Sequence, residues 1–587
     1  MSVLSTQSGN SEQTTSTGLH SKSGIRVRRY PVIRALLGAI FVFIAIFFSN
    51  EALARAIAGR PATDLSWGPA LFRLLLGFHG LVLLAYRPSR SATPETREAA
   101  SATDSRVWWI VGGLTVLALA LRLWRLDTSL WLDEILTMVD FAKPRLGLIL
   151  SSFPNQNQHM FYSVLSHFSM QVFGEHAWTL RLPAVFFGAA TIPALFLAGR
   201  KIVGEREALL TCALLTVSYH HIWFSQNARG YSGLVFFTML STWLWMEALD
   251  RDRWRWWMFY AISCTLGLWI HMTMVFVVAG QVAVYAILVI FRQREARWSW
   301  RAPAAWILGA TMTLQLYALS LPEFFRTAIS EVSMPSEWTT PLWSLMEIVR
   351  GLQIGYSGAA VLLAGALMFF TGWLHLFRQS PRAGLIMTVP GILGAAFMLS
   401  SSHNLWPRFF LFMIGFGLLI AIHGAFLIPR LLLRPIRAAA DGRLAVRVGM
   451  TAAGLLIAAS AATVPRCYAL PKQDFTGALA YVEQNRSVGD AVVTVGLAGH
   501  AYGKYYAPQW TVVETPDQLA SVRAQHQRTL LVYTLGIEMK AFHPELWRAV
   551  EAEFQTVRVF RGTLGGGEVY VCEERTPNRS AAAIPHE

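Results

Sequence analysis

Charged residues are scarce in this chain of 587 residues. Only 14% of its residues are Asp, Glu, Lys or Arg, whereas 54% are hydrophobic. A soluble domain usually has about 25% charged residues. The sequence also lacks a Gly-rich phosphate loop, a Cys/His pattern with zinc-ligand spacing and an RNA-binding signature. The excess of 50 basic over 35 acidic residues therefore does not indicate nucleic acid, and it is typical of basic cytoplasmic loops in a membrane protein.

Cysteine is also rare, with four in the chain. Cys212 and Cys264 fall in apolar segments, where we expect small buried thiols. Cys467 and Cys572 flank the C-terminal region, and they could form a disulfide if that region lies outside the cytoplasm. The sequence alone is compatible with a disulfide between Cys467 and Cys572 and with two free thiols.

Long apolar runs are abundant instead, and thirteen of them are predicted to cross a membrane as helices, since about 20 residues span its hydrocarbon core. These runs are Val32–Ser49, Trp67–Tyr86, Val107–Trp124, Thr179–Arg200, Arg206–Phe224, Gly230–Leu249, Trp257–Ile270, Met274–Phe291, Ala304–Leu321, Gly358–Phe377, Gly384–Leu399, Phe409–Ile428 and Val446–Val464. Residues 1–30 precede them as a polar segment that we predict to be disordered and cytoplasmic.

The segment His159–Phe173 is apolar but short for a span. If it does not cross, the Arg-rich loops of the whole chain fall on the cytoplasmic side, as the positive-inside rule requires. If it crosses, every later basic loop moves outside. We therefore predict that this segment lies in the outer interface, and that the N-terminus is inside and the C-terminus outside. The long stretch Arg125–Trp178 then becomes a large first outer loop.

Composition changes at Pro465, and alternating helix and strand signals follow. Strands are predicted at residues 491–495, 511–514, 529–534, 556–560 and 568–571, with helices at 474–485, 516–527 and 545–554. This pattern predicts a small α/β domain over residues 465–587 on the outer side. No catalytic motif is evident in it.

Two adjacent carboxylates, Asp133 and Glu134, give the strongest local signal, because they follow a predicted span within the first outer loop. Carboxylates at a membrane face are costly unless they are solvated or used. One reading is catalysis or metal binding. The other is an ordinary helix start, with Asp133 as N-cap and Glu134 in the first turn.

Further polar side chains collect in the predicted outer segments, where arginines at headgroup depth suit a lipid phosphate. Each could instead be an ordinary interfacial or snorkelling residue. They are His159, Gln226, Asn227, Arg229, Tyr231, His271, His403 and Arg408. The spans are mostly free of ionisable groups near their middle, which disfavours a transporter.

The order of these motifs resembles the C-type (GT-C) glycosyltransferases that use polyprenyl-phosphate sugars, and especially bacterial relatives of protein O-mannosyltransferases and of the lipid A aminoarabinose transferase. The resemblance covers roughly residues 107–430. It rests on residues 129–134, the His159 segment, residues 180–183, the Gln226–Tyr231 turn, the His271 turn and residues 407–410. Residues 107–464 would then be the transferase core, and residues 31–106 would add two transmembrane helices before it.

The resemblance implies a mechanism at the outer face. Asp133 would act as base toward an acceptor hydroxyl or help to hold a metal, and Glu134 is the second catalytic candidate. Arg181, Arg229 and Arg408 would stabilise the departing polyprenyl phosphate, and the sugar would be transferred with inversion. Some relatives bind a divalent metal through a carboxylate and a histidine, and Asp133, His159 and His271 are the candidates here.

Two positions depart from the family pattern. The family often has His-Pro-Pro where this chain has His159-Met160-Phe161, and often a Glu before Ala-Arg where this chain has Asn227. The second departure puts a further catalytic carboxylate in doubt and gives more weight to Asp133 and Glu134.

The resemblance predicts a bacterial inner-membrane enzyme that acts as a monomer with a periplasmic site. Its partners would be the polyprenyl-phosphate-linked sugar donor, membrane lipid and a protein, lipid or glycan acceptor. Two alternatives stay open, namely a flippase for lipid-linked sugars and a non-catalytic component of envelope polysaccharide assembly. A flippase would move the lipid without transferring sugar, and a scaffold would depend on its C-terminal domain for partners.

Overall fold

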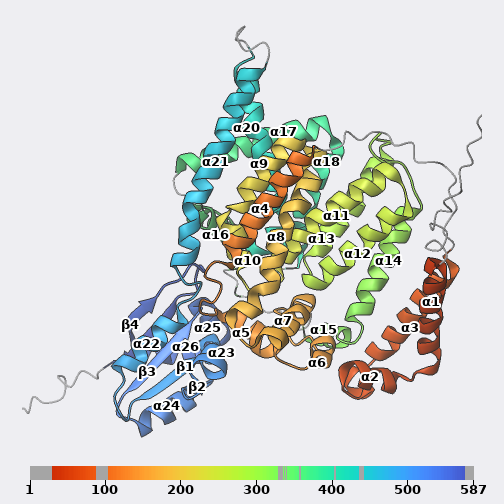
Figure 1. Cartoon of the computed structure of the whole chain (residues 1–587). Coiled ribbons are helices and arrows are strands. Elements are labelled where there is room, and N and C mark those ends of the chain that lie inside the picture. Colours follow the sequence, from red (N-terminus) through yellow and green to blue (C-terminus); the bar gives the residue numbers. More distant parts are fainter. Residues whose placement is uncertain are drawn as a thin grey trace, which may run out of the picture.

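The computed structural model describes residues 29–86, 104–327, 335, 338, 340–355, 359–401, 403, 405–434 and 442–575. Almost all of the predicted disordered segment, residues 1–30, lies outside this range. Most of the described chain forms a helical bundle, and a mixed α/β unit adjoins one end of it (Figure 1).

Each predicted span coincides with a helix or with two consecutive helices. These helices are α1 (Arg29–Phe47), α3 (Gly68–Ala85), α4 (Ser105–Leu123), α8 (Ala177–Ile202), α9 (Glu205–Thr216) with α10 (Tyr219–Ser225), α11 (Tyr231–Arg251), α12 (Trp254–Ile270), α13 (Met274–Ile290), α14 (Arg301–Tyr317), α17 (Ala359–Gln379), α18 (Pro381–Ile386) with α19 (Val389–Ser400), η4 (Pro407–Met413) with α20 (Ile414–Leu432), and α21 (Arg443–Ala469). The apolar runs therefore predict the helices well.

Fewer of these helices are long and apolar enough to cross a membrane unaided. Within the described residues seven meet that requirement, and nine do so if two strongly bent pairs each count as one span. α12 and α13 are only 17 residues long. The mostly helical, membrane-type fold is thus confirmed, whereas the number thirteen stays a prediction.

Close helix packing in the bundle depends on small residues. A Cβ on Gly424 of α20 would lie 1.8 Å from the carbonyl oxygen of Met368 on α17, and one on Gly372 would lie 2.2 Å from that of Ile420. Glycine at both crossing points lets the two backbones touch, as small residues do between transmembrane helices.

The first outer loop folds into short helices at one end of the bundle. They are α5 (Leu132–Leu136), η2 (Thr137–Ala142), α6 (Leu146–Ser151) and α7 (Met160–Phe173). Figure 1 shows α5, α6 and α7 grouped there, beside the C-terminal α/β unit. The segment His159–Phe173 thus forms a short helix at the bundle end, where the sequence predicted an interfacial one. Other short helices are α2 (Asn50–Ala58), η1 (Ala62–Leu65), α15 (Leu321–Thr327) and α16 (Pro341–Gly355).

The C-terminal residues form a five-stranded mixed sheet of order β2-β1-β3-β5-β4. Its strands are β1 (Ala491–Val495), β2 (Thr511–Val513), β3 (Thr529–Thr534), β4 (Phe554–Phe560) and β5 (Val569–Glu574), and its helices are α22 (Phe475–Asn485), α23 (Leu497–Ala501), η6 (Tyr502–Tyr506), α24 (Pro516–Gln525), α25 (Gly536–Phe542) and α26 (Pro544–Glu553). β1 pairs in parallel with β2 and β3, and β5 pairs antiparallel with β3 and β4. β1 and β3 are wholly buried, as the central strands of a two-sided sheet should be.

The possible disulfide between Cys467 and Cys572 is absent, because all four cysteines are free thiols. Cys467 lies near the end of α21, with its sulfur 4.0 Å from the carbonyl oxygen of Tyr219. Cys572 lies inside the sheet on β5, opposite Leu531. The two thiols therefore belong to different packing units, which the linear sequence does not reveal.

Candidate active site

The two predicted catalytic carboxylates lie on α5, a helix of five residues whose residues are all buried. α5 begins after Trp131 and continues into the π-helical turn η2. Because successive helical residues point about 100° apart, Asp133 and Glu134 face different surroundings although they are adjacent in sequence.

Glu134 is fully enclosed and fully paired. The Arg181 guanidinium binds both of its oxygens, with Nε–Oε1 at 2.7 Å and Nη2–Oε2 at 2.5 Å. The backbone N–H of Ala228 donates to Oε1 at 2.8 Å, and the Lys472 ammonium lies 3.3 Å from Oε1. Burial alone would raise the pKa of Glu134, but the charges of Arg181 and Lys472 outweigh it and lower the pKa to about 2. Glu134 is therefore a permanent anion that ties α5 to α8.

Asp133 has looser partners, and 11% of its side chain is exposed. Its Oδ2 lies 3.3 Å from Nη1 of Arg408 and 3.9 Å from Nη2 of Arg229. These contacts bring together Asp133 of α5, Arg229 of the turn before α11 and Arg408 of η4. In the sequence, 96 positions separate the first two of these residues and 179 separate the last two. Neither ion pair is short, so a competing anion could bind one of the two guanidinium groups and release the Asp133 carboxylate from it.

Arg229 is held from its other side by the first outer loop. Its Nη1 donates to the carbonyl of Asn157 at 2.9 Å, and its Nη2 donates to the Asn157 side chain at 3.0 Å. Only 3% of the Arg229 side chain is exposed. The buried guanidinium is thus fixed rather than snorkelling, in contrast to the ordinary interfacial reading.

His159 and His271 lie edge to face, with ring centroids 4.5 Å apart. Nδ1 of His159 accepts from the backbone N–H of Gly230 at 3.2 Å. Burial, together with the charge of Arg229, lowers the pKa of His159 well below its usual value and that of His271 to about 3. Both rings are therefore neutral at physiological pH.

The other predicted site residues divide between scaffold and surface. Gln226 donates to the carbonyls of Arg122 and Trp124 at 3.0 and 2.7 Å and so fixes the end of α4. Asn227 accepts from the indole of Trp131 at 3.1 Å, and Tyr231 packs against the His271 ring. His403 contacts Gln156 at 3.3 Å, at the edge of this set.

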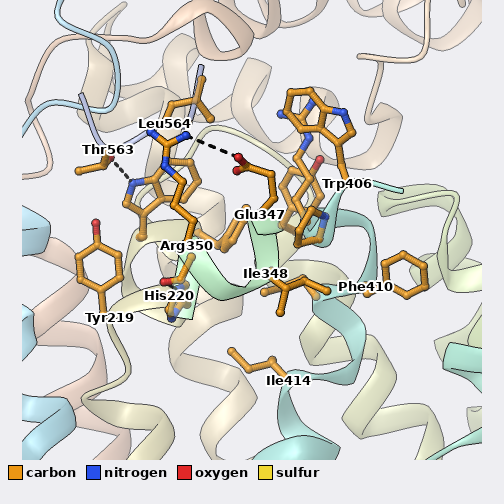
Figure 2. A pocket seen from close by; sticks show the side chains of 18 of the residues that line it. Tyr219, His220, Glu347, Ile348, Arg350, Trp406, Phe410, Ile414, Thr563 and Leu564 are labelled. Atoms are coloured by element: carbon orange, nitrogen blue, oxygen red, sulfur yellow. Dashed lines mark hydrogen bonds and ion pairs between the residues drawn. The ribbon is translucent and has the colours of Figure 1, made fainter. Parts of the chain in front are cut away.

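A cavity of about 840 Å³ opens beside these residues. Asn227, Tyr231 and Arg408 belong to its wall, together with aromatic side chains that include Trp131, Trp223, Trp338, Trp343 and Trp406. Figure 2 shows Thr563 and Leu564 of the C-terminal unit at one side of the cavity and Ile414 of α20 at another. Its size and its mostly apolar wall with a few polar groups are typical of a ligand site.

Several buried donors near Asp133 have no partner within the described residues. They are Nε of Arg229, Nε of Arg408, Nδ2 of Asn227 and the indole N–H of Trp406, and Nε2 of His271 is also unpaired. More than 90% of buried polar groups in proteins are hydrogen-bonded. A group of unpaired donors, two of them cationic, is suited to bind negatively charged oxygen atoms.

The predicted metal candidates do not assemble a metal site. In the part of the chain that the structure describes, no three His, Cys, Asp or Glu side chains are grouped to hold an ion. Asp133 faces two arginines instead, and Nδ1 of His159 is occupied by Gly230. The residues present do not fit a divalent cation bound by Asp133, His159 and His271.

Sequence reasoning missed Lys472 and the tryptophans of the cavity. Lys472 lies 338 residues from Glu134 in the chain, so no local pattern could join them. The tryptophans are spread over five elements and loops, and each alone resembles an ordinary interfacial aromatic.

Comparisons with known proteins agree with the resemblance seen in the motifs. Residues 159–321 match the sequence model of the dolichyl-phosphate-mannose-protein mannosyltransferase family. No curated protein matches the chain. The matched stretch includes His159, Arg181, Arg229 and His271 but not Asp133, Glu134 or Arg408.

Comparison with solved structures finds proteins of low sequence identity to this chain. ArnT from Cupriavidus metallidurans, bound to undecaprenyl phosphate, is 14% identical with a TM-score of 0.45, over 83% of this chain and 100% of that one. The Archaeoglobus fulgidus oligosaccharyltransferase is 12% identical with a TM-score of 0.44, over 77% and 73%. The arabinosyltransferase EmbB from Mycobacterium smegmatis is 14% identical with a TM-score of 0.38, over 71% and 45%. The family-model match over residues 159–321 agrees with the resemblance in that stretch, while the roles of individual residues depend on the geometry of this chain.

Proposed function

We propose that this protein is a membrane glycosyltransferase that moves a sugar from a polyprenyl-phosphate donor to an acceptor hydroxyl, with inversion, on the periplasmic face of a bacterial inner membrane. The observation that supports it most is that Asp133 contacts two arginines, each with an unpaired buried Nε–H group, and that one of them, Arg408, also lines a large aromatic cavity. The cavity suits an isoprenoid lipid, and the donors suit its phosphate.

Donor binding gives Asp133 its catalytic role in this proposal. The phosphate of the donor competes for Arg408, whose ion pair with Asp133 is long and partly exposed. Asp133 then accepts the proton of the acceptor hydroxyl. The acceptor oxygen bonds to the anomeric carbon from the face opposite the phosphate, and the bond from that carbon to the phosphate oxygen breaks.

The leaving polyprenyl phosphate gains negative charge as that bond breaks. Arg408 and Arg229 lie beside Asp133, so their guanidinium groups can stabilise this charge. Arg181, a third phosphate candidate from the sequence, is fully engaged with Glu134 and with three backbone carbonyl groups, those of Leu126, Thr128 and Ser129. We therefore assign Arg181 and Glu134 to positioning α5 rather than to the reacting atoms. No step requires a metal.

The test is sugar transfer by purified protein in lipid vesicles, with radiolabelled undecaprenyl-phosphate sugars and an envelope extract as acceptor. Asp133→Asn removes the base, and it should lower transfer by about 100-fold or more. Asp127→Asn is the matched control, because Asp127 is an exposed carboxylate of the same loop, and it should transfer like the wild type.

Three outcomes separate the readings. Transfer by wild type and Asp127→Asn but not by a folded Asp133→Asn variant supports the proposal. Equal transfer by all three proteins removes Asp133 from the chemistry. If no donor is used but labelled lipid crosses the vesicle bilayer, the flippase reading replaces the transferase one.

A further inference from the structure

Two residues that join the bundle to the C-terminal unit reach into the candidate active site. After α21 ends, the chain passes Lys472 and Gln473 before α22 begins. Figure 1 shows α21 descending into the C-terminal unit beside α5. Both side chains are directed toward the first outer loop, although more than 330 residues separate them from it in sequence.

Gln473 supplies the hydrogen bond that α5 lacks at its start. Its Oε1 accepts from the backbone N–H of Leu132 at 3.0 Å. The first N–H groups of a helix have no partner within it, and a side-chain acceptor normally caps them. Trp131, the residue at the N-cap position, provides no such acceptor. The cap of this helix therefore comes from the far end of the chain.

The amide nitrogen of the same side chain holds the C-terminal sheet. Nε2 of Gln473 donates to the carbonyl of Gly567 at 3.0 Å and to the hydroxyl of Thr534 at 3.3 Å. Gly567 directly follows Gly566, which belongs to the cavity wall. Gln473 is 1% exposed, and its side chain bridges α5 and a cavity loop by direct hydrogen bonds.

Lys472 adds a charged contact to the same helix. Its ammonium lies 3.3 Å from Glu134, donates to the carbonyl of Gln226 and lies 5.3 Å from the centre of the Trp223 ring. Other contacts across this boundary join Tyr506 to the carbonyl of Leu130 at 2.7 Å and His500 and Lys504 to Asp140. The loop around α5 is therefore fastened to the C-terminal unit at several points.

We infer that Lys472 and Gln473 are positioning residues that fix α5, and with it Asp133, so that the C-terminal unit completes the active site. The inference rests on the proposed transferase function for its catalytic part. A helix of five residues cannot be stable by itself, because helix nucleation is unfavourable and short helices are marginal. The position of Asp133 therefore depends on the contacts that α5 makes with Arg181, Lys472 and Gln473.

The test combines hydrogen exchange with kinetics on the full-length protein in lipid. Gln473→Met removes both hydrogen bonds at nearly constant volume, and Gln473→Glu keeps the acceptor for Leu132 but loses the donor toward Gly567. Gln518→Met is the matched control, because Gln518 is exposed on α24 of the same unit. Gln473→Asn serves as a milder change if Gln473→Met fails to fold.

Gln473→Met should speed amide exchange in a peptide covering residues 130–136 by about fivefold, the usual effect of losing a helix cap. Gln473→Glu should restore protection of that peptide, and Gln518→Met should leave it unchanged. In transfer assays kcat should fall in Gln473→Met, while KM for the lipid donor changes by less than about twofold, since Gln473 itself does not line the cavity.

Unchanged exchange in a folded Gln473→Met variant would overturn the inference. A parallel rise in KM with no loss of kcat would also overturn it, because that pattern indicates a role in donor binding. If wild type transfers no sugar at all, the proposed function fails, but the exchange measurement still decides whether Gln473 positions α5.

Discussion

Glu134 and Arg181 form a two-pronged ion pair at 2.7 and 2.5 Å, and both side chains are almost completely buried. Planar carboxylate and guanidinium groups match in this arrangement. The pair joins α5 to α8, so it holds the loop that carries Asp133 against the bundle. A buried pair of this kind is costly to break, because the partner left behind is an uncompensated charge.

We expect Glu134→Gln to lower the free energy of unfolding by about 3–5 kcal/mol. The pKa of Glu134 is lowered from 4.5 to about 2, so its stabilising effect is complete above pH 4.5 and is lost as pH falls toward 2. The difference between wild type and variant should therefore shrink below pH 4.5. Thermal unfolding in detergent at pH 7 and pH 3.5 measures this.

Glu175→Gln is the control for that experiment, because the Glu175 side chain is 58% exposed in its pair with Lys143. Exposed pairs contribute little, so this change should alter stability by less than about 1 kcal/mol. Equal effects of the two substitutions would contradict a structural role for Glu134.

The sequence predicted the helices and strands of this protein better than the contacts between them. Apolar runs located the helices, and short β-rich runs located all five C-terminal strands, because both signals are local. The sequence also selected Asp133, Arg229 and Arg408, which the structure brings together. It could not assign different roles to Asp133 and Glu134. That difference arises because Arg181 of α8 and Lys472 both bind Glu134. Contacts over more than 300 residues, such as that of Gln473 with Leu132, leave no local pattern.

Arg408 should control affinity for the phosphate of the donor. Its guanidinium stacks on Trp406, 3.9 Å from the ring centre, and its Nε has no partner within the described residues. Arg408→Met should raise KM for the lipid-phosphate donor by about 10- to 100-fold, as expected for lost hydrogen bonds to a charged group. Arg408→Lys should have a KM for the donor between those of wild type and Arg408→Met, since lysine keeps the charge but lacks the planar guanidinium group.

Arg106→Met provides the comparison for Arg408, because Arg106 is exposed at the start of α4. Steady-state kinetics with varied donor and fixed acceptor measure both variants. An unchanged KM for the donor in Arg408→Met would exclude contact between this arginine and the donor phosphate.

Gly417 offers a way to fill the cavity without disturbing the fold. It lies on α20 in the cavity wall, and a Cβ there would meet no atom within 4 Å. Gly417→Leu should raise KM for the donor by about tenfold, which corresponds to about 1.4 kcal/mol of binding free energy. Gly112→Leu on α4 is matched to it, because a Cβ at Gly112 also meets nothing, and it should bind donor normally. Equal donor affinity in both variants would show that the lipid lies elsewhere.

Lys472 should give the activity an alkaline limit near neutral pH. Burial lowers the pKa of its ammonium from 10.5 to about 7, although Glu134 partly opposes this shift. Arg181, Cys467, Trp223 and the carbonyl of Gln226 also face it. Above pH 7 the amine becomes neutral, so Glu134 loses one cation and α5 loses one contact. We therefore expect kcat to fall above pH 7 in wild type but not in Lys472→Arg, whose guanidinium stays charged.

Stability should change in the opposite direction over the same range. Between pH 7 and 10.5 the unfolded chain keeps a proton on Lys472 that the folded chain has released, so this group makes the protein more stable as pH rises. A loss of kcat between pH 7 and 9 with no fall in the unfolding temperature would thus identify deprotonation of Lys472 rather than denaturation. The same alkaline limb in Lys472→Arg would instead assign the titration to another group.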